Sequence, residues 1–376
     1  MKKKLLIILA ISMIFTTGCW DMIEIEDRLL PYTVAIDLSR DGKDNAKRFF
    51  ICFSYPNINA LTEGPSQEDY AFLINANADS IFGAVDQISS RTYNPVFLKH
   101  LKVIVLSDQV AQNEQYMREI LDGLKRDYII NKMIDLVITR GSAHELLVKK
   151  LESSRQHTIE GLFTTLLRNK QRSNQFTPMS LKDFIYNMDH KKAAIIPLAS
   201  GDPEIEIAGG GLFKDYRLIG FIDADENRNI SLLNGDANTE DIDFEYNGAN
   251  LSLSLLAIRA RKKLVDEENL KIQYQLSVDA QVHQYVIDPD KKLQTTEVFE
   301  DIQNKIAKIM VDDFNQTIER LQKEFNADAL GILEYLYKFH PKIYKEVEKD
   351  WDSIFPYIDI EVDVDVKIRR RGLSDY

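Results

Sequence analysis

The chain has 376 residues, of which 44% are hydrophobic and 28% charged, and its formal net charge is −12. This composition is that of a folded globular protein, so disorder is excluded as the main state. The acidic balance disfavours nucleic acid as a partner and provides no general attraction to anionic lipid. The length suggests two or three domains.

The N-terminus predicts a signal peptide over residues 1–18. Three lysines, Lys2 to Lys4, precede an apolar run of eleven residues, Leu5 to Phe15. A basic start, a short apolar centre and a small-residue exit are typical of a secretory signal peptide. A membrane-spanning helix needs about 20 apolar residues, so the run is too short for an uncleaved anchor.

Cys19 is the predicted lipid attachment site. It follows Gly18 directly, at the expected cleavage point, which is the arrangement of a bacterial lipoprotein with S-diacylglycerol and N-acyl groups on the cysteine. The alternative is ordinary secretion with a free Cys19 thiol, and Thr16 stands where lipoprotein signals usually carry leucine. Removing residues 1–18 deletes three lysines and no acidic residue, which changes the net charge from −12 to −15. Membrane attachment then depends on the lipid chains, each buried CH₂ of which contributes about 0.8 kcal/mol to the free energy of binding.

Cys52 is the only other cysteine. It lies in the apolar run Phe49 to Phe53, which predicts a buried strand and a core thiol. With Cys19 lipidated, the fold has to be stable without a disulfide.

Residues 19–200 predict an N-terminal α/β domain. Strands are expected at Tyr32–Leu38, Lys47–Tyr55 and Tyr70–Ala76, with Asp79 capping a helix that runs to about Ser90. Strands and helices then alternate. The further elements are strands at 101–106, 133–138 and 193–198, and helices at 112–126, 143–151 (capped by Ser142), 159–168 and 181–188. This alternation predicts βα units with some parallel pairing.

Residues 201–240 predict a small middle domain that begins at Gly201-Asp202-Pro203. A hairpin is expected from Ile205–Phe213 and Arg217–Ile222, followed by a helix at 225–233. Gly209-Gly210-Gly211 is not followed by the Lys-Ser or Lys-Thr of a phosphate-binding loop, so the three glycines indicate a bulge or a close backbone approach.

Residues 241–376 predict a C-terminal α+β domain with long strands. Leu251 to Ile258 shifts its apolar phase, which indicates a β-bulge. Residues 297–325 carry one apolar stripe of a long helix: Phe299, Ile302, Ile306, Ile309, Phe314, Ile318, Leu321 and Phe325. Shorter helices start at Asp328 and Pro341. The final strand alternates apolar residues with Asp359, Glu361, Asp363 and Asp365, so one sheet face is buried under helices and the other faces water. The fold class is therefore mixed α/β (α+β), with a sheet in each of three domains.

No catalytic or metal-binding pattern is visible, and no cofactor is expected. The six histidines show no metal-ligand spacing on a helix: His100, His144, His157, His190, His283 and His340. Asp223 to Asn234 begins like a calcium loop, but Arg228 replaces the turn glycine and Asn234 the bidentate glutamate. The acidic strand face and Arg369-Arg370-Arg371 are interpreted as solvated surface.

Three motifs resemble one family. Cys19-Trp20-Asp21 with Glu24-Ile25 resembles the mature start of the Ger(x)C family, the C subunits of spore germinant receptors. Gly209 to Phe213 with Leu218-Ile219-Gly220 resembles its glycine-rich hairpin. Trp351, Phe355 and the final strand through Gly372 resemble its C-terminal signature. The motifs occur in the expected order, so the resemblance covers the whole chain.

The resemblance implies a lipoprotein on the outer, extracytoplasmic face of the inner spore membrane. It implies A and B membrane subunits as partners, three mixed α/β domains and a response to nutrients; no catalytic residues are carried over. The first hypothesis is therefore a non-enzymatic, lipid-anchored receptor subunit. The second is a solute-binding lipoprotein that captures the nutrient, and the third a lipid-anchored hydrolase. The ligand-binding residues and the nutrient stay open.

Overall fold

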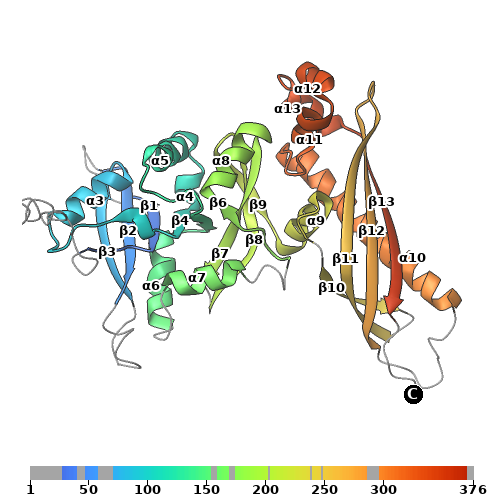
Figure 1. Cartoon of the computed structure of the whole chain (residues 1–376), viewed down its shortest axis with the longest axis horizontal. Helices are drawn as coiled ribbons and strands as arrows, with labels where there is room; N and C mark the ends of the chain where they lie inside the picture. The colour runs from blue at the N-terminus through green and yellow to red at the C-terminus, as the bar shows by residue number, and fades with distance from the viewer. Residues whose placement is uncertain are drawn as a thin grey trace, which may run out of the picture.

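A computed structural model describes residues 28–39, 47–57, 71–153, 159–168, 174–201, 204–237, 239–246, 249–285 and 296–370. These residues form two β-sheets with helices packed on them, side by side along the long axis of the molecule (Figure 1). The mixed α/β class is confirmed. A separate sheet in each of three blocks is wrong, because the strands at residues 205–214 and 217–222 belong to the first sheet.

Nine of the described strands form the first sheet, which has a parallel centre. Its order is β3 (Ala71–Ala78), β2 (Phe49–Pro56), β1 (Thr33–Leu38), β4 (Val103–Ser107), β5 (Asp135–Thr139), β7 (Ala193–Gly201), β8 (Ile205–Lys214) and β9 (Arg217–Ile222), with β6 (Met179–Ser180) pairing to β5. Strands β1, β4, β5 and β7 are parallel, as the alternation of strands and helices predicts, and the outer strands pair antiparallel. The predicted boundary after residue 200 falls within β7.

Helices cover both faces of this sheet (Figure 1). One face packs against α3 (Ile81–Ser89), η2 (Leu98–His100), α4 (Asp108–Ala111), α5 (Glu114–Arg126) and α8 (Leu181–His190). The other packs against α6 (Ala143–Ser153) and α7 (Ile159–Arg168). The central strands are therefore buried on both sides, which explains their continuous apolar sequences.

Cys52 lies in the layer under α6 and α7, fully buried, so the predicted core thiol is confirmed. Burial, with a smaller effect of the Asp37 charge, raises the pKa of the thiol to about 12. Because the thiolate is the reactive form, Cys52 is expected to resist maleimides in the folded protein and to react in denaturant. Mass spectrometry of labelled protein checks this, and full labelling of Cys52 under native conditions would contradict it.

Asp135 opens β5, and burial raises the pKa of its carboxyl group to about 6. The folded chain therefore holds this proton more tightly than the unfolded chain, so the stabilisation is complete below about pH 4 and is lost as the pH rises through 6. Asp135→Asn removes the cost of burying a carboxylate. We expect it to increase the free energy of unfolding by roughly 1–3 kcal/mol at pH 7 and by little at pH 4. Urea titrations at both pH values, with Asp122→Asn as a surface control, measure it; equal effects of Asp135→Asn at the two pH values would contradict the prediction.

The second sheet has the order β10 (Glu240–Tyr246), β11 (Ala249–Asp266), β12 (Lys271–Tyr285) and β13 (Ile360–Arg370). Strand β13 lies parallel to β12, and the other pairs are antiparallel. The predicted bulge appears as a register shift between Leu255 and Ala257. Val362, Val364 and Val366 of β13 are buried, Ile360 and Ile368 are half-buried, and Glu361, Asp363 and Asp365 are exposed, as the alternation predicts.

The long helix α10 (Thr296–Glu319) crosses the buried face of this sheet and continues as a π-helical turn, η4 (Arg320–Phe325). The predicted stripe is confirmed except at Ile309, which is 41% exposed while Met310 is buried. The chain then forms α11 (Ile332–Phe339), α12 (Pro341–Val347), α13 (Trp351–Ile354) and η5 (Phe355–Tyr357). The helix expected from Asp328 begins at Ile332 instead, with Gly331 as its N-cap residue. The Asp328 carboxylate still accepts the N–H groups of Ile332 and Leu333 at the start of α11.

Ser80, rather than Asp79, caps α3, because its hydroxyl accepts the Gly83 N–H while Asp79 pairs with Lys47. The close approach at the glycines is confirmed: Gly209 has φ +64°, and a side chain there would overlap the Ile222 carbonyl oxygen. At Gly210 a side chain would overlap Ile195.

Candidate functional junction between the two sheets

Helix α9 (Ala224–Asn234) lies where the two sheets meet (Figure 1). Asp223 accepts the Glu226 N–H, and the Glu226 carboxylate accepts the Asp223 N–H, which forms a reciprocal N-terminal cap. Gly235 ends the helix with φ +75°. The segment that begins like a calcium loop is therefore a helix, and Asp223 is its N-cap.

Buried polar side chains of α9 bind the first half of the chain. Asn227 is fully buried and donates to the Asn174 carbonyl oxygen at 3.3 Å and to the Thr177 hydroxyl at 3.4 Å. The Ser231 and Thr177 hydroxyl groups lie 2.7 Å apart. Such bonds are directional, so they set the position of α9 relative to the loop before β6.

Other residues of α9 bind the second half. Asn229 donates to the Thr317 hydroxyl at 2.9 Å and to the Asp313 carbonyl oxygen at 3.3 Å, both on α10. Glu226 pairs with Arg320 at 2.5 Å, and the hydrogen bonds of Arg320 with Glu324 and Glu226 raise the pKa of its guanidinium group. Asn234 donates to the Ala329 carbonyl oxygen. One helix is thus hydrogen-bonded to both halves of the molecule.

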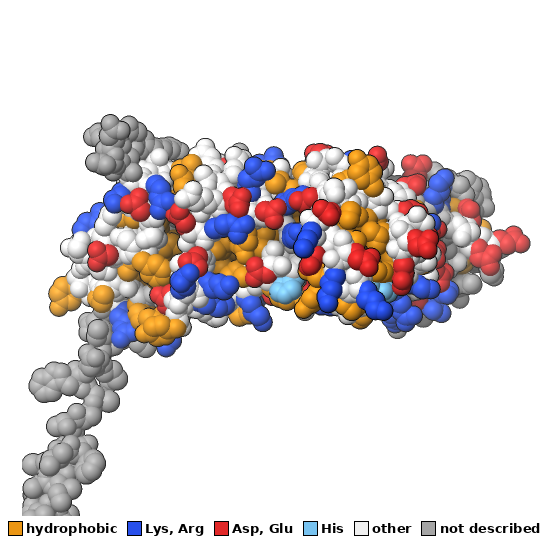
Figure 2. Space-filling view, turned by 90° about the horizontal axis from the view of Figure 1, so that it is seen from above, with side chains coloured by type: hydrophobic (Ala, Val, Ile, Leu, Met, Phe, Trp, Pro, Cys, Tyr) orange, Lys and Arg blue, Asp and Glu red, His pale blue; other side chains and the backbone are white. Residues whose placement is uncertain are grey.

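A second set of contacts joins the two halves through α8 and α11, which lie beyond α9 at the top of Figure 1. Figure 2 views the molecule from this side and shows acidic and basic side chains interspersed on it. Glu334 of α11 accepts from the Tyr186 hydroxyl at 2.8 Å and pairs with Lys338 at 2.6 Å and Lys191 at 3.4 Å. These partners overcome the burial of Glu334 and lower its pKa to about 2. The junction is therefore polar and ionic as well as packed.

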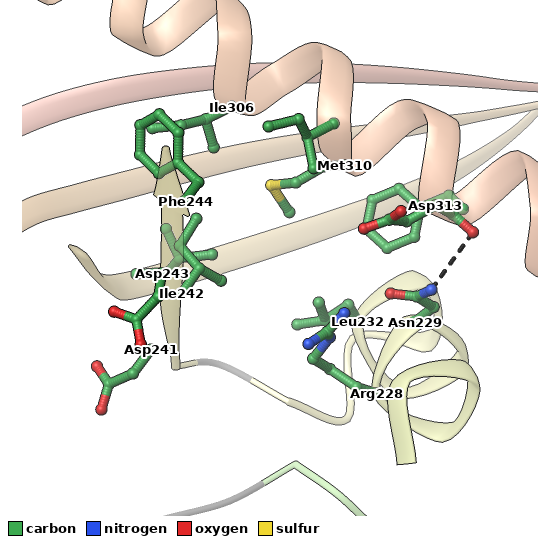
Figure 3. Close-up of a pocket in the computed structure, with 13 residues that line it drawn as sticks. Arg228, Asn229, Leu232, Asp241, Ile242, Asp243, Phe244, Ile306, Met310 and Asp313 are labelled. Carbon is green, nitrogen blue, oxygen red and sulfur yellow. Dashed lines mark hydrogen bonds between the residues drawn. The ribbon is translucent and has the colours of Figure 1, made fainter. Parts of the chain in front are cut away.

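A cavity of about 180 Å³ opens between α9, β10 and α10 (Figure 3). Part of its wall is apolar and includes Leu232, Ile242, Phe244, Ile306 and Met310. Its rim is polar and is formed by Arg228, Asn229, Asp241, Asp243 and Asp313. Burial raises the pKa of Asp313, and the Arg228 cation opposes that shift. The site can accommodate a small apolar group with a polar end.

A shallower cavity of about 210 Å³ lies at the carboxyl ends of β5 and β7, beside the start of α6. Ligands of open α/β sheets bind at such ends. Here, however, Asp37 of β1 accepts the N–H groups of Ala143 and His144, both at 2.8 Å, and the Ser142 hydroxyl. The chain's own carboxylate already occupies the helix terminus, so the site does not favour an anionic ligand.

The predicted lipid attachment residue, Cys19, lies outside the described residues. Within them, no three or more His, Cys, Asp and Glu residues gather as metal ligands would. His144 packs edge-on against Phe50, His190 stacks on Tyr186, and His340 is tilted against Tyr335. None of the helices that can be described has both the length and the apolarity to cross a bilayer.

Sequence reasoning missed the polar residues of the junction. The available signal was a short helix with three small polar residues, Asn227, Asn229 and Ser231, where an amphipathic helix would carry apolar ones. Polar side chains on two sides of this helix indicate hydrogen-bond partners on both sides. The sequence does not identify which residues those partners are.

The fold and the junction define a two-sheet α/β protein whose halves meet at helix α9 and at the contacts of Glu334. Two family models match it in sequence: the spore germination protein N-terminal domain over residues 21–200, and the spore germination B3/GerAC-like C-terminal model over residues 208–372. The chain belongs to the GerAC-like family of spore germination proteins, the C subunits of germinant receptors.

Relatives in Bacillus subtilis strain 168 match along their length. Spore germination protein B3 is 23% identical over 362 residues, which are 94% of each chain. Spore germination protein A3 is 21% identical over 365 residues, 96% of each chain, and spore germination protein KC is 19% identical over 404 residues. The crystal structure of the GerBC protein has the same fold, with a TM-score of 0.58 at 18% identity over 90% of this chain and 97% of that one.

Proposed function

We propose that this C subunit is a lipid-anchored, non-enzymatic component of a nutrient germinant receptor on the outer face of the inner spore membrane. The observation that carries the proposal is the full-length family match, with both halves in order. The signal peptide and Cys19 support the lipid anchor. The A and B membrane subunits of the same receptor are the proposed partners.

The junction suggests how the subunit acts. A partner that binds one half of the molecule can influence the other through α9, because this helix is hydrogen-bonded to both. The three blocks 19–200, 201–240 and 241–376 are retained as proposed domains, with the middle block as the connection.

Gene deletion tests the proposal. Spores without this subunit should lose or slow germination with particular nutrients, and a plasmid copy should restore it. Germination with non-nutrient triggers serves as the control, because it bypasses the receptor. Normal germination with every nutrient tested would contradict the proposal.

The cavity beside α9 supports a second function, capture of the nutrient by this subunit itself. Calorimetry of the full mature chain against single nutrients measures such binding. Met310→Phe fills the cavity and should abolish it, whereas Met133→Phe, at a methionine that is 59% exposed, should leave it unchanged. Equal binding by both variants would exclude the cavity as the site.

A further inference from the structure

No helix of the described residues covers one face of the second sheet, which we call the open face. Helix α10 crosses the opposite face (Figure 1). The side chains of the open face come from alternate positions of β11, β12 and β13, and most are exposed. A sheet face this large is solvated in many antiparallel sheets, so its exposure alone identifies no partner.

At the centre of the open face the charges are sorted into rows. Strand β11 contributes a basic row, Arg259, Arg261 and Lys263. Strand β12 contributes a neutral row, Gln273, Gln275 and Ser277. Strand β13 contributes an acidic row, Glu361, Asp363 and Asp365.

The register aligns the rows residue by residue. Arg261 is opposite Gln275, which is opposite Asp363. Each such set of three aligned residues forms a line across the strands. On one side of the central line lie Lys263, Gln273 and Glu361. On the other side lie Arg259, Ser277 and Asp365. Strands lie about 4.8 Å apart, so the basic and acidic rows are separated by roughly 10 Å, with the neutral row midway.

The rows are only partly neutralised within the chain. Glu361 pairs with Lys271 at 3.2 Å, and Asp365 pairs with Lys367 at 2.7 Å. Among the described residues, Arg259, Arg261, Lys263 and Asp363 have no ion pair. The central line therefore ends in an unpaired cation on one side and an unpaired anion on the other.

We propose that the open face binds the open face of a second copy of this chain, around a twofold axis that runs along β12. Rotation about this axis places β11 of one copy opposite β13 of the other. It leaves the position of each residue along the strand direction unchanged. Arg261 of each copy then lies opposite Asp363 of the other, with Lys263 opposite Glu361 and Arg259 opposite Asp365. Gln275 lies on the axis, opposite its own counterpart.

The signs of the charge rows and the lengths of the side chains both favour a twofold axis along β12. A twofold axis across the strands would place the basic row on the basic row, which is repulsive. Facing sheets pack about 10 Å apart. A long arginine or lysine opposite a short aspartate or glutamate fits that spacing, and glutamine opposite glutamine can exchange hydrogen bonds. The interface is self-complementary, as a twofold dimer requires.

Cross-linking tests the axis directly in the full-length protein in its membranes. Gln275→Cys places a thiol opposite its own counterpart, so a short bismaleimide should link it into a covalent dimer. Glu114→Cys, on α5, is the surface control and should stay monomeric, as should the unmodified chain, whose Cys52 is buried. Absence of a Gln275→Cys dimer would overturn the proposal.

Charge reversal tests the pairing. Arg261→Glu alone and Asp363→Arg alone should each weaken self-association at least tenfold, because each homodimer then contains two like-charged pairs. A mixture of the two variants should form heterodimers. In these, the introduced glutamate of one copy meets the introduced arginine of the other, and the remaining native Arg261 meets the remaining native Asp363. Differently tagged copies and co-purification measure this, and circular dichroism verifies that each variant is folded.

The outcomes separate the possible occupants of the open face. Restored association in the mixture supports the homodimer. If both variants associate as the unmodified chain does, or if the mixture shows no restoration, the proposal is wrong. Loss of binding to another protein without any change in self-association would assign the open face to that protein instead.

Discussion

Replacing Cys19 by alanine is expected to move the protein from the membrane fraction to the soluble fraction. Each buried CH₂ of a lipid chain contributes about 0.8 kcal/mol, so two or more chains provide stable attachment. The acidic net charge provides no general attraction to anionic lipid, and none of the described helices is long and apolar enough to span a bilayer. Fractionation with metabolic lipid labelling measures both consequences.

Cys52→Ala is the matched control, because it removes the other cysteine and leaves the signal unchanged. It should stay in the membrane fraction and carry the lipid label. If the Cys19→Ala protein remains membrane-bound and lipid-labelled, the assignment of Cys19 is wrong. If it remains bound without label, partners hold it, and the energetic argument for the lipid fails.

Trp351→Ala is expected to lower the free energy of unfolding of the second sheet and its helices by about 3–5 kcal/mol, the usual cost of truncating a large buried aromatic side chain. Trp351 is 2% exposed, packs against Phe355 with ring centroids 5.9 Å apart, and belongs to the core under α10. Urea unfolding followed by circular dichroism measures the loss.

Two variants sharpen this prediction. Tyr357→Ala truncates an aromatic residue in the same segment that is 81% exposed, and it should cost less than about 1 kcal/mol. Trp351→Phe should cost much less than Trp351→Ala, because it retains most of the ring and removes a buried indole N–H that has no partner among the described residues. Equal losses for Trp351→Ala and Tyr357→Ala would contradict the packing of Trp351.

Elements whose signal is local were predicted well. The alternation of apolar and acidic residues in β13, the stripe of α10 and the hairpin of β8 and β9 all appear in the structure. In each case side-chain periodicity decides which face is buried, and periodicity is a property of neighbouring residues. Ile309 deviates because Met310 reaches the sheet in its place.

Contacts between distant residues were not predictable. The sequence of residues 205–222 predicts a hairpin. Its pairing with β7 depends on the edge that β7 presents in the folded sheet, which the hairpin sequence does not specify. The bonds of Asn227 and Asn229 join residues 50 to 88 positions apart. Nothing in a single sequence specifies those partners.

The amino-acid sequence by itself determined the signal peptide prediction, the secondary structure, the buried faces and the family resemblance, because each depends on the order and spacing of nearby residues. The tertiary structure alone decided that there are two sheets, that α9 connects them, and that the rows of the open face are aligned. Strand register places Arg261, Gln275 and Asp363 in one line, and only backbone pairing across the fold can establish that alignment.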